Sequence, residues 1–270
     1  MEKINRLGWT AGISFTAYGR RIGVRVNDAT LLGRVRELLP FGSREVDYPT
    51  VERLYSVYVG TARGGKVRPF HLLYQDGALA ARTPELAVMM DSFTTNLRSY
   101  VAEHARRRVF IHAGVVGWQG RAILIPGRSF SGKSTLVAEL MRAGARYYSD
   151  EYAVLDERGR VHPFLKPVSL RNGGFEQTEV PAARIGRSGK RPLPVGLVVV
   201  TRYLEGTRWR PRAVSAGQGV LEMVANAVAV RHEPERTLAT LELALRGARV
   251  LKGARGDARE EAAAILEAVG

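Results

Sequence analysis

Residues 121–144 read RAILIPGRSFSGKSTLVAELMRAG, and this stretch decides the fold. It opens with a short apolar run, which is typical of a buried strand. A glycine-rich loop follows, and the remainder reads as a helix that ends at Gly144, since glycine commonly closes a helix. A strand, a glycine-rich loop and a helix in this order indicate the core of an α/β domain.

The loop inside this stretch fits a phosphate-binding pattern, in which two glycines enclose four residues and are followed by lysine and a hydroxyl residue. Its residues are Gly127, Arg128, Ser129, Phe130, Ser131, Gly132, Lys133, Ser134 and Thr135. Glycines let backbone N–H groups curl around phosphates, the Lys133 ammonium neutralises phosphate oxygens, and the Ser134 hydroxyl suits magnesium. We therefore expect this loop to bind ATP with Mg²⁺. The alternative is an ordinary glycine-rich turn between a strand and a helix.

An acidic pair, Asp150-Glu151, comes 17 and 18 residues after Lys133, following one predicted helix and one predicted strand. This order returns the chain beside the loop, so Asp150 should end a strand close to the phosphates and the metal. Asp150 could also accept the proton of an incoming hydroxyl, because phosphoryl transfer needs a positioned proton acceptor. The alternative is a solvated turn, the usual setting of an isolated Asp-Glu pair.

His112 lies in an apolar run, residues 109–116, that reads as the strand before the strand of the loop. A histidine in such a run commonly packs in the core with its ring hydrogen-bonded. The remaining histidines show no metal-ligand spacing, so zinc is not indicated.

Composition narrows the class of protein. The chain has 270 residues, a net charge of +15 and no cysteine, which excludes thiol nucleophiles and cysteine-ligated zinc. Its longest apolar stretches have strand length, so we expect a soluble, cytoplasmic protein without a membrane span. The charge is compatible with a nucleic-acid partner. However, arginine supplies 35 of the 41 basic residues and is scattered along the chain, so nucleic acid is not the expected partner.

The pattern on either side of the loop predicts two parts, an N-terminal α+β region over residues 1–108 and a P-loop domain over residues 109–270. A long helix should begin at Thr83-Pro84-Glu85 and run to about Arg106. Before it, we expect a helix within residues 28–39 and strands within residues 8–26, 52–59, 69–75 and 78–82.

In the second part, residues 166–194 are rich in glycine, proline and basic side chains, which predicts a mobile loop. The other elements follow from apolar periodicity and from capping residues. We expect strands over residues 109–116, 122–127, 147–148, 152–155, 195–203 and 248–251, and helices over residues 215–230, 234–245 and 257–269.

An ordered series of short motifs within residues 109–155 resembles the HPr kinase/phosphorylase superfamily, serine kinases that share a nucleotide-binding core with phosphoenolpyruvate carboxykinase. The series is His112-Ala-Gly, Gly120, the loop from Gly127, Ala-Gly144-Ala-Arg, and Ser149-Asp150-Glu151, at spacings that agree with the family pattern. With the C-terminal order of strand, helix, helix, strand and helix, the resemblance covers roughly 160 residues. It implies an α/β fold of the HPr kinase / PEP carboxykinase type, a mixed sheet flanked by helices.

The resemblance implies a role for each matching residue. Asp150 would be the catalytic base beside the attacking serine hydroxyl, whereas Gly132, Lys133 and Ser134 would hold the phosphates and the metal. His112 would have a supporting role in the active site.

Two positions depart from the family pattern. Glu151 stands where the family has its second acidic residue, and this longer carboxylate would be a further metal ligand. The downstream signature associated with phosphorolysis is not recognisable in residues 170–174. We therefore expect kinase activity without phosphorylase activity.

These observations predict an ATP-dependent kinase that phosphorylates a serine-type hydroxyl on a protein or peptide, with Asp150 as the base and Lys133 stabilising the transferred phosphoryl group. Some similar proteins accompany modified-peptide biosynthesis, so a biosynthetic precursor peptide is one such acceptor. Two alternatives stay open, a nucleotide-binding regulator or scaffold without transfer activity and a small-molecule kinase. The sequence also leaves the oligomeric state open.

Overall fold

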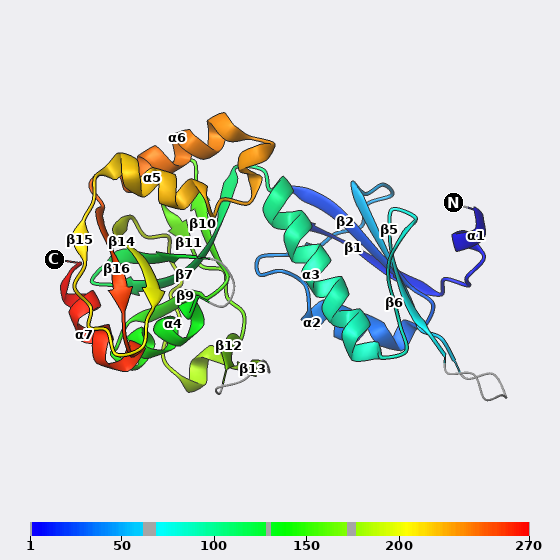
Figure 1. The fold of residues 1–270 in the computed structure, drawn as a ribbon. Helices are drawn as coiled ribbons and strands as arrows, with labels where there is room; N and C mark the ends of the chain where they lie inside the picture. The colour runs from blue at the N-terminus through cyan, green and yellow to red at the C-terminus, as the bar shows by residue number, and fades with distance from the viewer. Residues whose placement is uncertain (1, 62–68, 128–130, 172–176, 270) are drawn as a thin grey trace. The chain divides into compact units, whose positions relative to one another are not determined.

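The computed structural model describes residues 2–61, 69–127, 131–171 and 177–269, and the chain divides into two compact units, residues 1–106 and 107–270 (Figure 1). Each unit has a mixed sheet and its own helices, which confirms the predicted mixed α/β class. None of the helices in the described ranges is long and apolar enough to cross a membrane.

The first unit is a six-stranded sheet with one long helix packed on it. The strand order is β3-β1-β2-β4-β5-β6, with β2 and β4 parallel and the other neighbours antiparallel. Tyr55 on β4 packs edge-on against Phe93 of α3 at 5.5 Å, and its hydroxyl donates to the Asn96 carbonyl at 3.1 Å. The elements are α1 (Glu2–Asn5), β1 (Ala11–Ala17), β2 (Arg20–Val26), η1 (Ala29–Leu31), α2 (Leu32–Glu37), β3 (Arg44–Glu45), β4 (Arg53–Tyr58), β5 (His71–Gln75), β6 (Ala78–Thr83) and α3 (Leu86–His104).

The start of α3 differs from the prediction. The helix begins at Leu86, because Thr83 still pairs with His71 in the β5–β6 ladder. Proline at 84 disfavours a helical conformation for the residue before it. The Thr83 hydroxyl instead accepts a hydrogen bond from the Glu85 amide at 3.2 Å.

The second unit is an eight-stranded sheet between two pairs of helices. The strand order is β11-β10-β7-β8-β14-β16-β15, and β9 also pairs with β7. The elements are β7 (Arg108–Trp118), β8 (Arg121–Pro126), α4 (Lys133–Arg142), β9 (Arg146–Ser149), β10 (Tyr152–Asp156), β11 (Val161–His162), β12 (Val168–Arg171), β13 (Gln177–Val180), η2 (Ala182–Arg184), β14 (Val195–Tyr203), β15 (Arg212–Ala213), α5 (Ala216–Val224), η3 (Ala229–Arg231), α6 (Pro234–Leu245), β16 (Arg249–Arg255) and α7 (Ala258–Glu267).

The alternation of side chains along the central strands gives this sheet two buried faces. On β8, Ile123 and Ile125 belong to the core under α4 and α7, whereas Ala122 and Leu124 belong to the core under α5 and α6 (Figure 1). Successive side chains of a strand point to opposite faces. Because β8, β14 and β16 are parallel, their carboxyl ends meet at one edge, where α/β proteins commonly bind ligands.

The prediction of a mobile loop over residues 166–194 is wrong for the described part of this segment. It contains β12 and β13, which pair antiparallel, and the short helix η2. Val168 lies in the core beside α4, so burial and strand pairing override the glycine- and proline-rich composition. The helix expected over residues 215–230 also ends earlier, at Val224.

Candidate active site

The glycine-rich loop leaves the carboxyl end of β8 and enters α4. The Gly127 amide donates to the His112 carbonyl at 3.2 Å, which fixes the loop entrance to the neighbouring strand β7. A Cβ at Gly127 would lie 2.8 Å from the Ser131 hydroxyl and 3.8 Å from Cδ of Lys133, so the Lys133 side chain runs back past Gly127. The sequence-predicted loop residues Arg128, Ser129 and Phe130 lie outside the described residues.

The exit of the loop has the geometry of an anion site. Gly132 is the N-cap of α4 and has a left-handed conformation, with φ of +80°, and as a glycine it offers no side chain to the first amides of the helix. Backbone amides at the N-terminus of a helix favour an anion. The buried Ser131 hydroxyl also has no hydrogen-bond partner within the described part of the chain. Thr135 is exposed, and Ser134 is partly buried.

Asp150 directly follows β9, at the start of the short connection to β10, and it is buried, contrary to a solvated turn. The Ser149 hydroxyl accepts hydrogen bonds from the amides of Glu151 and Tyr152 at 3.1 and 2.9 Å, which holds the turn closed. The Asp150 side chain is only 1% exposed. Its Oδ1 accepts from the Tyr147 hydroxyl at 2.9 Å and its Oδ2 accepts from the Ser169 amide at 3.0 Å.

A lysine that the sequence did not single out completes the environment of Asp150. Lys166 is 8% exposed, and its Nζ lies 3.1 Å from Asp150 Oδ1 and 4.0 Å from Glu151 Oε2. The ammonium also donates to the Ser169 hydroxyl at 2.9 Å and to the Pro167 carbonyl at 3.2 Å. Lys166 therefore supplies the positive charge that a buried carboxylate requires.

Lys133 connects the loop electrostatically with both other predicted catalytic residues. Burial lowers the pKa of Lys133 to about 8, and the negative charge of Asp150 acts in the opposite direction. Partial removal of the imidazole from water and then the Lys133 charge lower the pKa of His112. Lys133, Asp150 and His112 thus belong to one electrostatic neighbourhood.

His112 is not a buried core residue. It lies on β7 opposite Tyr152 of β10, is exposed, and its ring lies 4.8 Å from that of Tyr152 at an angle of 36°. Its backbone donates to the Asn226 carbonyl at 2.8 Å and accepts from Gly127. An imidazole that is held at the loop entrance and open to solvent can meet a ligand there.

The donor set fits magnesium. Ser134, Asp150 and Glu151 offer hard oxygen ligands, and magnesium commonly uses one or two carboxylates together with phosphates and water. Within the described residues, no group of three or more His, Cys, Asp or Glu side chains gathers to form a complete metal cage. Because the Lys166 ammonium contacts Asp150 Oδ1, a metal that binds this oxygen would compete with the ammonium.

Sequence reasoning missed three residues that contact the predicted ones, Tyr147, Lys166 and Arg255. Tyr147 falls in the strand expected over residues 147–148, and Lys166 falls in the segment predicted as a loop. Arg255 donates to the Gly132 carbonyl at 2.9 Å across 123 residues of sequence. A periodic pattern carries no signal for such long-range contacts.

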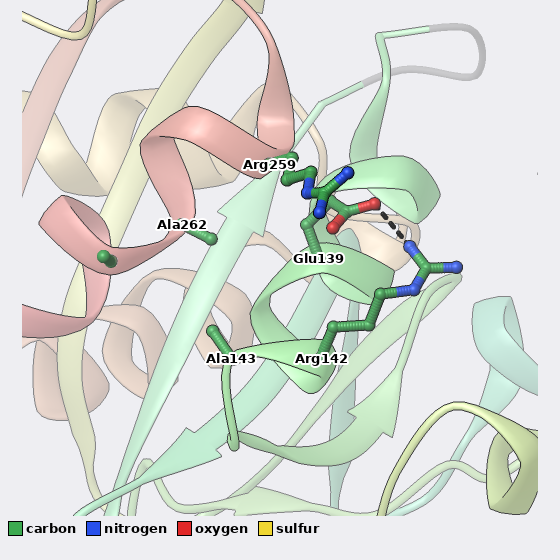
Figure 2. Close-up of a pocket in the computed structure, with 6 residues that line it drawn as sticks. Glu139, Arg142, Ala143, Arg259 and Ala262 are labelled. Carbon is green, nitrogen blue, oxygen red and sulfur yellow. Dashed lines mark hydrogen bonds and ion pairs between the residues drawn. The ribbon is translucent and has the colours of Figure 1, made fainter.

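A separate surface hollow of about 690 Å³ lies between α4 and α7, away from the start of α4 (Figure 2). Figure 2 shows the ion pair between Arg142 and Glu139 at one side of it. The lining residues are Glu139, Arg142, Ala143, Arg259, Ala262 and Ala263. None of them is a predicted site residue.

Comparison with known proteins gives a distant structural likeness. The chain is similar to the solved structure of the Hpr(Ser) kinase/phosphatase from Coxiella burnetii, with 17% sequence identity over 59% of this chain and 93% of that chain, and a TM-score of 0.32. No family model and no curated protein matches the chain. At this identity the likeness concerns the fold alone, and the TM-score is too low for it to support any statement about activity.

Proposed function

We propose that this chain is an ATP-dependent phosphotransferase that binds the nucleotide at residues 127–135. The observation that supports the proposal is the arrangement of the loop, in which Lys133 folds back past Gly127 at the carboxyl end of β8. Loop amides and the Lys133 ammonium would bind the phosphates. The buried Asp150 carboxylate lies within electrostatic reach of that ammonium.

Magnesium is the expected companion of ATP at this site. Ser134, Asp150 and Glu151 would hold it, and when bound it neutralises charge on the phosphates. The loop residues would orient the phosphates, and Asp150 would accept the proton.

In the proposed reaction, the oxygen of a serine-type hydroxyl on a protein or peptide forms a bond to the γ-phosphorus. The bond between this phosphorus and the β–γ bridging oxygen breaks, and ADP leaves. The hydroxyl proton passes to Asp150. Its Oδ2 accepts one hydrogen bond, from the Ser169 amide, whereas its Oδ1 accepts a hydrogen bond from the Tyr147 hydroxyl and contacts the Lys166 ammonium. Each carboxylate oxygen can accept about two hydrogen bonds, so Oδ2 is the suitable proton acceptor.

Access to Asp150 is a condition of this reaction. The carboxylate is 1% exposed, so an acceptor hydroxyl reaches it only when the segment that carries Lys166 and Ser169 moves. A peptide acceptor, including a biosynthetic precursor peptide, has the short flexible chain that could enter such an opening.

A second candidate function is a nucleotide-binding regulator without transfer activity. The closed environment of Asp150 favours it, because the carboxylate is 1% exposed and Lys166, Tyr147 and Ser169 already contact its two oxygens. In that case the loop would bind ATP and Asp150 would have only a structural role.

The test is transfer of label from [γ-³²P]ATP with magnesium to proteins, peptides and metabolites of a cell extract, followed by mass spectrometry of the labelled product. The proposal expects transfer by the wild type and none by Lys133→Ala or Asp150→Asn, whereas Lys190→Ala, at an exposed lysine, should retain activity. ATP binding without transfer to any acceptor would favour the regulator. A labelled metabolite would show that the acceptor is a small molecule and not a protein or peptide. Equal labelling by all variants would contradict the proposal.

A further inference from the structure

We propose that Arg255 is a positioning residue for the phosphate loop, an inference that rests on the proposed function. Arg255 ends β16 and is 2% exposed, so its charge lies inside the second unit. Its Nη2 donates to the Gly132 carbonyl at 2.9 Å, and its Nη1 donates to the Gly256 carbonyl at 3.0 Å. The guanidinium therefore ties the carboxyl end of β16 to the start of α4.

The contact with Gly132 acts on the amide of the next residue. The Gly132 carbonyl and the Lys133 N–H belong to one planar, trans peptide group, so they point in opposite directions. Holding the carbonyl oxygen toward Arg255 fixes the direction of the Lys133 N–H on the other side. A hydrogen bond from a cation also polarises the peptide and makes its N–H a stronger donor. The Lys133 amide is one of those that this loop would offer to phosphate.

Gly132 and Arg255 fit each other closely. A Cβ at Gly132 would lie 2.6 Å from Nη2 of Arg255, so the guanidinium occupies the space of a side chain. The same carbonyl accepts the first helical hydrogen bond of α4, from the Leu136 amide at 3.1 Å. Two donors on one oxygen leave this peptide little freedom to rotate.

Arg255 has charged neighbours of both signs near the start of α4. Its Nε is buried without a hydrogen-bond partner among the described residues. Of the nearby carboxylates, Asp257 accepts the Arg259 amide at 2.8 Å and Glu261 accepts the Trp209 amide at 2.7 Å. The negative charges of Asp257 and Glu261 offset part of the charge of Arg255. Lys133 and the N-terminus of α4 add positive charge that a phosphate at the loop would meet.

The test measures binding of inorganic tripolyphosphate, without nucleoside or magnesium, by isothermal titration calorimetry. Arg255→Gln should bind about tenfold more weakly than the wild type, a difference of about 1.4 kcal/mol. Arg255→Lys should fall between the two, because it keeps the charge but cannot span both carbonyls. Arg249→Gln makes the same charge change at the exposed first residue of β16 and should bind as the wild type does.

A second readout separates positioning from general stability. In ¹⁵N-labelled protein without ligand, Arg255→Gln should move the Lys133 amide proton resonance upfield, because the peptide loses its polarising partner. Wild-type affinity in Arg255→Gln, or in Arg255→Lys if the first variant does not fold, would overturn the inference. If Lys133→Ala binds tripolyphosphate as the wild type does, or the wild type does not bind it, the proposed function itself fails and takes this inference with it.

Discussion

Replacing Lys166 with methionine tests the buried ion pair that closes the candidate active site. The Lys166 and Asp150 side chains are 8% and 1% exposed, and their charged atoms lie 3.1 Å apart. Removing one partner of a buried pair typically costs about 3–5 kcal/mol, because the other charge is left uncompensated. Asp150 keeps the hydrogen bonds from Tyr147 and Ser169, so we expect a loss near the lower end, about 3 kcal/mol in the free energy of unfolding.

Urea unfolding followed by tryptophan fluorescence measures this loss, since Trp118 and Trp209 lie in the same unit as Lys166. Lys190→Met, at an exposed lysine, is the matched control and should change the free energy of unfolding by less than about 0.5 kcal/mol. The double variant Lys166→Met/Asp150→Asn should recover most of the loss, because no buried charge remains. A loss below about 1 kcal/mol in the single variant, or no recovery in the double variant, would refute the reasoning.

The same variant tests whether Lys166 and a divalent cation compete for Asp150. Once the ammonium is gone, magnesium should raise the free energy of unfolding of Lys166→Met more than that of the wild type, since a ligand stabilises the state that binds it. An equal magnesium effect in both proteins would show that Lys166 and the cation do not compete for Asp150.

Two further predictions concern stability. Gly132→Ala should lower the free energy of unfolding by about 1–3 kcal/mol, because alanine would have a strained left-handed φ of +80° and would clash with the Arg255 guanidinium. Gly120→Ala is the control, since its φ is +77° but the space around it is open, and it should cost less. Equal losses of the two variants in urea unfolding would show that the clash with Arg255 contributes nothing. Burial alone would raise the pKa of Asp156, but hydrogen bonds from His162 and from the amides of two residues in the following turn lower it. Asp156 therefore stabilises the fold above its unfolded pKa near 3.8, and this contribution disappears as pH falls through the lower folded pKa. The stability difference between wild type and Asp156→Asn should narrow as pH falls below about pH 4, and a difference that does not change between about pH 5 and pH 3 would contradict this account.

Much of the second unit could be predicted from local sequence patterns. Helix α6 has the predicted bounds because Pro234 starts it and its apolar face recurs at helical spacing. The strands around Gly120 follow from apolar runs and a tight turn, and Asp257 caps α7 as expected, by accepting the Arg259 amide at 2.8 Å. Each of these signals involves residues close together in sequence.

The contacts within the candidate site could not be predicted in the same way. Lys166 reaches Asp150 because β12 returns to the end of β9, and Arg255 reaches Gly132 because β16 lies two strands from β8 in the sheet. The order of the large sheet decides the Arg255 contact, whereas the path of β12, which pairs with β13 outside that sheet, decides the Lys166 contact. Neither residue lies in a recognisable motif. The predicted roles of Lys133, Asp150 and His112 stay predictions, although the structure brings the three titratable side chains into one electrostatic neighbourhood.

The most direct test of the central claim is a double-mutant cycle on the affinity for magnesium ATP, measured by isothermal titration calorimetry with Lys133→Ala, Asp150→Asn and the combined variant. If the loop and the carboxylate form one nucleotide site, each single change should weaken binding, and the combined effect should differ from the sum by more than about 0.5 kcal/mol. Effects that add within that margin, or an affinity unchanged by Asp150→Asn, would contradict the account.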